Sequence, residues 1–132
     1  MGRIFARSID EVAWEQTRNT DSAGNPGYIR RKIMGDEANG PYARVTEYSP
    51  GFYEQAHSHD ADEYIFVLEG ELTIGDTTYK KGTLIFIEAN TVYGPLKGGP
   101  NGLRFFILRP ASTKYYEAKT GRALPDNLIT NR

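Results

Sequence analysis

Short apolar runs, separated by Gly, Pro and polar residues, divide most of the chain into segments of four to seven residues. Runs of this length that are rich in β-branched and aromatic residues are typical of strands, and frequent turn residues between them are typical of a sandwich or barrel. Long stretches with helical periodicity are scarce. The pattern predicts an all-β protein with strands at residues 28–34, 42–48, 54–58, 64–68, 71–74, 77–80, 83–87, 91–94 and 103–108.

Several boundaries between these strands have a local cause. Gly75-Asp76 has the composition of a tight hairpin turn, and Glu69-Gly70 is expected to break a long apolar stretch into two antiparallel strands. Pro110 ends the last strong strand, because proline has no N–H to donate to a sheet.

The two ends of the chain are less regular. Ser8 and Glu11 have the spacing of a capping box, which predicts one or two helical turns near the N-terminus. Residues 18–27 are interpreted as a polar loop. Residues 111–132 are interpreted as a peripheral tail on the outside of the domain.

Length and composition narrow the class of protein. A chain of 132 residues suits a single domain, residues 1–132, and is long enough to bury a core. Sixteen Lys and Arg against 17 Asp and Glu give a net charge of −1, which argues against a nucleic-acid partner. No apolar run approaches the length of a membrane helix, and residues 1–11 lack the apolar segment of a secretory signal. The absence of cysteine excludes disulfides and thiolate metal sites and fits the expected cytoplasmic location.

The two histidines of the chain, His57 and His59, lie two residues apart. In a strand, residues with this spacing point to the same face, so both imidazoles can converge on one point. Glu63 follows at the start of the next predicted strand. Two histidines and one carboxylate are the ligand set of many non-haem metal sites with open positions. The alternatives are a pair of surface or hydrogen-bonded strand histidines and a solvated or salt-bridged glutamate.

The segment from Gly51 to Gly70 resembles the first motif of the cupin superfamily. That motif reads G, five residues, H-x-H, three or four residues, E, six residues, G, and Gly51, His57, His59, Glu63 and Gly70 match it. The resemblance covers residues 42–110. It implies a small antiparallel double-sheet, or jelly-roll, barrel and, for a chain of this size, a homodimer, in which strand 28–34 is a candidate for pairing across the interface.

The second cupin motif departs from the family pattern. Gly82 matches its first position, but Tyr93 stands where the fourth metal-binding histidine is expected. Tyr93 is therefore a candidate catalytic acid or a neighbour of the ligands, and Tyr93 and Gln55 are both candidates for the fourth ligand. An aromatic core residue is the alternative for Tyr93, and water can also complete the coordination.

Alternation along the strands suggests the lining of a pocket. Tyr53 and Gln55 are in phase with the histidines, and Ile65 and Val67 are in phase with Glu63.

On the last strand either Phe106 and Leu108 or Phe105 and Ile107 face inward, and Phe106 is the assigned pocket residue. Arg104 is on the same face as Phe106, where it is either a partner for an anionic substrate or, with more weight, a surface arginine. Residues 30–32, Arg-Arg-Lys, are interpreted as a solvated or interface strand.

The leading hypothesis is a metal-dependent enzyme that acts on a small molecule. His57, His59 and Glu63 would hold one divalent ion, either Fe, Mn, Ni, Cu or Zn, and a dioxygenase-type oxidoreductase is the first expectation. Two alternatives remain: a metal-dependent isomerase or lyase, and a non-catalytic metal-containing cupin that binds or senses a small molecule.

Overall fold

The computed structural model describes residues 2–111 and 113–125. Its elements are η1 (Ile9–Glu11), β1 (Glu15–Thr20), β2 (Pro26–Gly35), β3 (Tyr42–Tyr48), β4 (Tyr53–Glu54), β5 (His57–His59), β6 (Glu63–Ile74), β7 (Thr77–Lys80), β8 (Leu84–Ile87), β9 (Leu96–Arg109), β10 (Lys114–Glu117) and β11 (Ala123–Pro125). The predicted helical turn is confirmed as the 3-10 turn η1, in which the Ser8 hydroxyl accepts from the Asp10 amide. No helix in these residues is long and apolar enough to cross a membrane.

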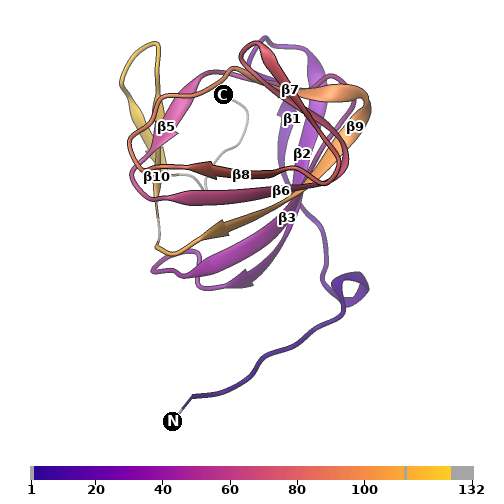
Figure 1. Ribbon diagram of the computed structural model, residues 1–132, viewed down its shortest axis with the longest axis vertical. Coiled ribbons are helices and arrows are strands. Elements are labelled where there is room, and N and C mark those ends of the chain that lie inside the picture. Colours follow the sequence, from indigo (N-terminus) through magenta and orange to yellow (C-terminus); the bar gives the residue numbers. More distant parts are fainter. Residues whose placement is uncertain (1, 112, 126–132) are drawn as a thin grey trace.

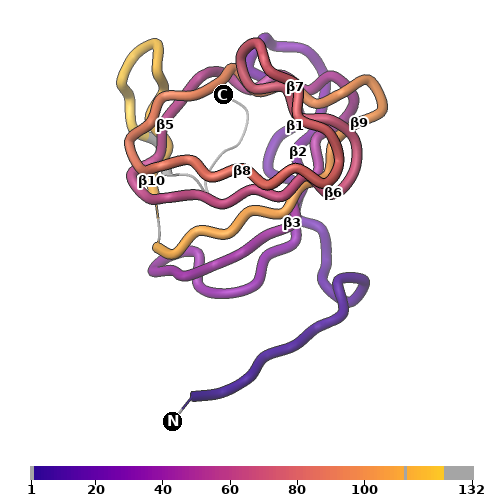
Figure 2. Tube along the Cα trace, in the orientation of Figure 1, coloured from indigo at the N-terminus to yellow at the C-terminus, as the bar shows by residue number. Residues whose placement is uncertain are grey.

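Antiparallel strands form two sheets that curve around a common interior (Figures 1 and 2). The larger sheet has the order β1-β2-β3-β9-β6-β7, with β4 also paired to β9 and β8 to β6. The smaller sheet has the order β11-β10-β5. This arrangement confirms the predicted all-β jelly-roll barrel and places the histidine strand β5 against the chain's C-terminal strands.

One predicted strand break, at Gly70, and one predicted strand, at residues 91–94, are wrong. Gly70 does not start a new strand, because β6 runs unbroken from Glu63 to Ile74 and changes register against β9 on either side of Gly70. Bulges absorb the bend there, and Gly70 has a φ of +77° that favours glycine. The predicted strand at residues 91–94 is instead an isolated bridge, in which Tyr93 and His57 exchange two backbone hydrogen bonds.

The polar ends of the domain contain strands that the hydrophobic pattern missed. Part of the predicted loop at residues 18–27 belongs to β1, which pairs with β2 and buries Arg18 to 2 % exposure against Glu54. The predicted peripheral tail contributes β10, which pairs directly with β5. The buried polar group is the Arg18 guanidinium in β1 and the Tyr115 hydroxyl in β10, and both contact Glu54. Burial in these two strands therefore does not follow hydrophobicity.

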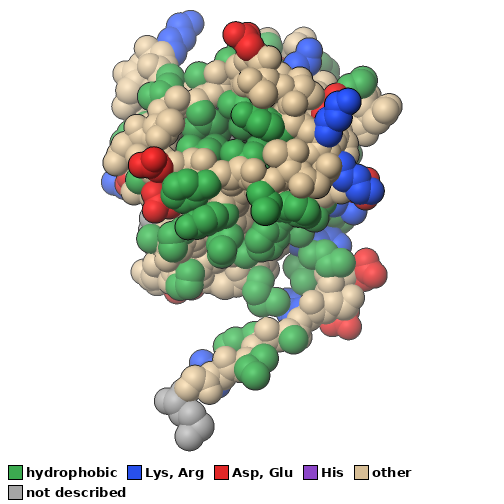
Figure 3. Space-filling view, in the orientation of Figure 1, with side chains coloured by type: hydrophobic (Ala, Val, Ile, Leu, Met, Phe, Trp, Pro, Cys, Tyr) green, Lys and Arg blue, Asp and Glu red, His purple; other side chains and the backbone are tan. Residues whose placement is uncertain are grey.

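The core and the outer face of the barrel are both apolar. Phe52, Val67, Leu72 and Phe105 are at most 2 % exposed inside the barrel. On the outside, a group of large hydrophobic residues on β6, β8 and β9 stays exposed, and Figure 3 shows hydrophobic side chains gathered over these strands. We call this group the outer patch; its members are Tyr64, Leu84, Phe86, Phe106 and Leu108.

Candidate functional site

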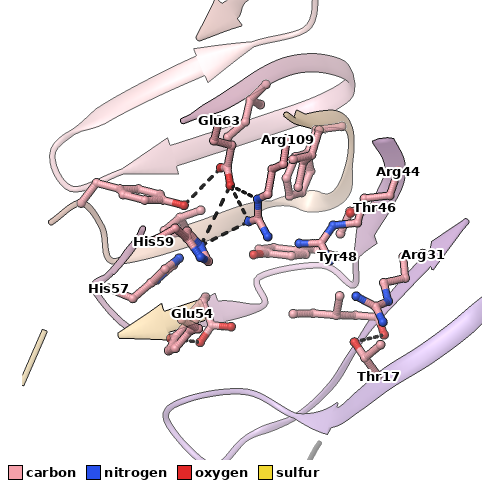
Figure 4. A pocket seen from close by; sticks show the side chains of 17 residues that line it. Thr17, Arg31, Arg44, Thr46, Tyr48, Glu54, His57, His59, Glu63 and Arg109 are labelled. Carbon is pink, nitrogen blue, oxygen red and sulfur yellow. Dashed lines mark hydrogen bonds and ion pairs between the residues drawn. The ribbon is translucent and has the colours of Figure 1, made fainter. Parts of the chain in front are cut away.

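A cavity in the barrel interior collects the polar side chains of seven strands, β1, β2, β3, β4, β5, β6 and β9, together with Tyr115 of β10 (Figure 4). His57, His59 and Glu63 all line it, so the structure brings the three predicted metal ligands to one wall. All three residues are at most 4 % exposed. The chemistry of the cavity is therefore set by their contacts with protein groups.

Both histidines have one ring nitrogen held by the backbone. Nδ1 of His57 lies 2.7 Å from the carbonyl oxygen of Gln55, and Nδ1 of His59 lies 3.1 Å from that of Lys114. A carbonyl oxygen only accepts, so Nδ1 carries the proton in both rings. In the neutral imidazole Nε2 is then the nitrogen with the lone pair, which is the tautomer suited to a base or a metal ligand.

Tyr115 of β10 packs directly on this pair. Its ring stacks on His57 at 4.3 Å with an interplanar angle of 17°, and it meets His59 edge-on at 5.7 Å. The Tyr115 hydroxyl donates to Glu54 across 3.2 Å. Sequence reasoning missed Tyr115 because it lies in a polar segment, where only the Tyr115-Tyr116 pair signalled an apolar contact.

Glu63 forms a buried ion pair with Arg109 at the end of β9. The Nε of Arg109 donates to Glu63 Oε2 across 2.7 Å, and its NH2 group also contacts that oxygen. Burial alone raises the pKa of Glu63, but the charge and hydrogen bonds of Arg109, with the nearby His59 and Arg44, hold it below its usual range. Glu63 is therefore a carboxylate, and Arg109 is a fixed positive charge inside the site.

Arg109 occupies the space between two of the predicted ligands. Its NH2 group lies 3.2 Å from Nε2 of His59, and that nitrogen lies 4.0 Å from Glu63 Oε2. A metal held by both residues would need the lone pairs that Arg109 already contacts and would lie beside its positive charge. Among residues 2–111 and 113–125, no group of three His, Cys, Asp or Glu side chains is placed to hold a metal ion. The arrangement does not fit the predicted three-ligand centre.

The two candidates for a fourth ligand lie on different sides of His57. Tyr93 is held to His57 by two backbone hydrogen bonds, its ring lies 4.7 Å from the imidazole, and its hydroxyl donates to Glu63 Oε1 across 3.2 Å. Gln55 points elsewhere, because its side-chain amide donates to Glu117 across 2.6 Å. Tyr93 therefore lines the cavity beside His57 and Glu63, and Gln55 is not among the lining residues.

Only some of the residues predicted to line the pocket face the cavity. Ile65 lines the cavity, whereas Val67 is buried in the core without lining it. Tyr53 is also off the lining, because residues 55 and 56 interrupt the strand and Glu54, not Tyr53, shares the inward side with the histidines.

The last strand has the opposite phase from the one assigned. Phe106 is 37 % exposed on the outer face, while Phe105 and Ile107 line the cavity. Arg104 is a surface arginine that binds Glu47. In the strand interpreted as solvated or part of an interface, Arg31 is 5 % exposed and lines the cavity.

Comparisons with known proteins agree with this architecture. A family model described as "Cupin domain" matches residues 44–108. No curated protein sequence matches the chain. Solved structures that resemble it include the polyketide cyclase RemF from Streptomyces resistomycificus, with a TM-score of 0.71, 18 % identity and coverage of 96 % of this chain and 91 % of that one.

Two further structures have other described activities. An acetylacetone dioxygenase from Acinetobacter johnsonii has a TM-score of 0.65 and 11 % identity, with 94 % of this chain and 83 % of that chain covered. A cupin sugar phosphate isomerase from Silicibacter pomeroyi has a TM-score of 0.60 and 14 % identity, with 90 % and 91 % covered. At these identities the likeness concerns the fold and not the activity. With its motif, its barrel and the matched domain, the chain belongs to the cupin superfamily.

Proposed function

We propose that this cupin holds a small carbonyl compound in the barrel cavity and transfers protons on it, as isomerases and lyases do. The observation that carries the proposal is the pair of Nδ1 contacts to backbone carbonyls, which presents Nε2 of each histidine as a base. Because Arg109 donates to Nε2 of His59, we assign the base to His57.

The expected step is proton removal next to a carbonyl group. Nε2 of His57 takes a proton from the carbon beside the carbonyl, the electron pair of the C–H bond moves to the carbonyl oxygen, and an enolate forms. The guanidinium groups of Arg44 and Arg109 on the cavity wall favour that negative charge. Tyr93, whose ring lies 4.7 Å from His57, is the candidate proton donor to carbon in the return step, and the proton held by His57 then passes back to the Tyr93 oxygen.

A metal-dependent dioxygenase is the second candidate. The tautomer of the two histidines is also the one that metal ligands adopt, and Glu63 Oε2 lies 4.0 Å from Nε2 of His59. Iron, manganese, nickel, copper or zinc could use these residues only if Arg109 moved away from Glu63. The acetylacetone dioxygenase among the similar structures makes this candidate worth a direct test.

The test follows proton exchange and oxygen uptake on the same protein. In D2O, 2-oxobutanoate and other small carbonyl acids and diketones are incubated with the protein, and loss of the proton signals beside the carbonyl is followed by NMR. We expect exchange that persists after EDTA treatment and is lost in His57→Gln. Lys119→Gln, in an exposed turn, is the matched control.

Other outcomes assign the other candidates. Oxygen uptake that requires added iron, nickel or another divalent metal would replace the proposal with the dioxygenase. Binding of a compound with neither exchange nor oxygen uptake would make the protein a binding or sensor cupin and overturn the enzymatic proposal.

A further inference from the structure

A second group of polar side chains lies on the inner face of β2 and β3, away from the histidines. Arg31 and Thr46 are directly opposite each other across the two strands, and Arg44 is two residues before Thr46 on the same face. All three are at most 8 % exposed and line the cavity. Figure 4 shows them across the cavity from His57.

The hydroxyl group of Thr46 is the unexplained member of this group. Thr46 is 3 % exposed, and within the described part of the chain its Oγ1 has no hydrogen-bond partner. A buried hydroxyl without a partner costs free energy, and native proteins keep few of them. Because this hydroxyl lines a cavity, a bound molecule can supply the partner.

The charges around Thr46 indicate what kind of molecule that is. Arg31, Arg44 and Arg109 line the cavity, against the two carboxylates Glu54 and Glu63 among the described lining residues. Outside this lining, Glu37 contacts both Arg31 and Arg44, and Arg18 pairs with Glu54. The negative charge of Glu37 and the positive charge of Arg18 offset each other. Guanidinium donors beside a buried hydroxyl suit an acceptor that carries negative charge.

The ion pair with Glu37 also orients the arginines. Arg31 binds both oxygens of Glu37, at 2.8 and 3.2 Å, and Arg44 lies 3.5 Å from the same carboxylate. A guanidinium has five N–H donors in a rigid plane, so one side can contact Glu37 while the other faces the cavity. Glu37 therefore fixes the two arginines beside Thr46.

We infer that Arg44 and Thr46, flanked by Arg31, form a subsite for the carboxylate of a small organic acid. The carboxylate accepts from the guanidinium and from the Thr46 hydroxyl, and the rest of the molecule extends toward His57. In the proposed function this makes the substrate class an oxo acid. The inference rests on that function only in that the cavity receives a ligand; the subsite itself requires no turnover.

The experiment titrates the isotopically labelled protein with propionate and with propionamide, its uncharged analogue, and follows amide chemical shifts in β2 and β3. We expect saturable binding of propionate that is about tenfold tighter than that of propionamide, because charge-assisted hydrogen bonds are lost with the amide. Equal binding of the two compounds, or no binding of propionate, overturns the subsite.

Three variants locate the binding. Thr46→Val keeps the shape of the side chain and should weaken propionate about fivefold, the effect of one hydrogen bond, without lowering the unfolding temperature. Arg44→Gln should weaken it about tenfold or more. Arg104→Gln is the matched control, because Arg104 binds Glu47 on the outer face, and it should change nothing.

The results separate this inference from the proposed function. Propionate binding that depends on Thr46, in a protein without proton exchange, retains the subsite and removes the proposed reaction. Proton exchange in a protein whose Thr46→Val variant binds propionate like the unaltered chain retains the reaction and removes the subsite.

Discussion

Arg109 is the residue that separates this site from the one its sequence motif suggests. It contacts Glu63 and His59 and donates to the Tyr42 hydroxyl across 3.0 Å, so its guanidinium is surrounded by polar partners. A residue that ends a strand just before Pro110 carries no signal of this role in the sequence. The side chain nevertheless decides whether Glu63 can act as a ligand.

Arg109→Met should therefore change stability and metal affinity in opposite directions. Methionine fills much of the volume but leaves the Glu63 carboxylate buried without the guanidinium, and the free energy of unfolding should fall by about 3 kcal/mol. With the positive charge gone, the two histidines and Glu63 should bind Ni²⁺ more tightly than the unaltered protein does.

Urea unfolding and calorimetric titration with Ni²⁺ measure the two effects. Arg104→Met, at an arginine whose side chain is 45 % exposed, serves as the control and should alter neither one substantially. Unchanged Ni²⁺ affinity in Arg109→Met would show that the guanidinium does not keep the metal out.

At the scale of elements, Asp60 joins β10 to the histidine strand β5. Its Oδ1 accepts from the Thr113 hydroxyl at 2.6 Å and from the Lys114 amide at 2.9 Å, at the start of β10. Slight burial raises its pKa, but the hydrogen bonds from Thr113 and Lys114 outweigh that effect and lower it below the usual value. Ionised Asp60 therefore favours the docking of β10 on β5.

The sign of the pH dependence follows from that lowered pKa. The stabilisation by Asp60 is present above the pKa of the unfolded chain and is lost as the pH falls through the lower pKa of the folded state. The difference in unfolding free energy between the unaltered protein and Asp60→Asn should be present at neutral pH and disappear in acid, below the usual aspartate range. Urea unfolding across pH measures it, with Asp76→Asn in the β6–β7 turn as control; a difference that stays constant in acid would contradict the assignment.

Elements with one apolar face could be predicted from the sequence, and the others could not. β3 alternates clearly and was found, and the 3-10 turn followed from Ser8 and Glu11. β1 was missed because its buried residue is Arg18, whose charge is compensated in the interior by the distant Glu54. The inward phase of β9 stayed open because residues 105–108 are apolar on both faces. The motif located the histidines, but the contacts of Arg109 and Tyr115 arise only when distant strands meet.

At the scale of the molecule, the outer patch explains why both faces of β9 are apolar. Tyr64 is the cross-strand partner of Phe86 and of Leu108, and the Tyr64 and Phe86 rings lie 4.8 Å apart. Leu84, at the edge of this group, is 78 % exposed. Contiguous exposed apolar side chains on a sheet usually mark a surface that another molecule covers.

We predict that a second copy of the chain covers the outer patch and so forms the expected homodimer. Phe86→Arg places a charge within the outer patch and should convert the dimer into a folded monomer, because an unpaired charge is costly in an apolar interface. Sedimentation equilibrium over a range of protein concentrations measures the association, and Lys119→Glu, in an exposed turn, is the control. An unaltered protein that is monomeric at about 100 μM would contradict the prediction, since interfaces of standard size usually bind more tightly than that. A dimer that persists in Phe86→Arg would move the interface to another face, with strand 28–34 as the next candidate.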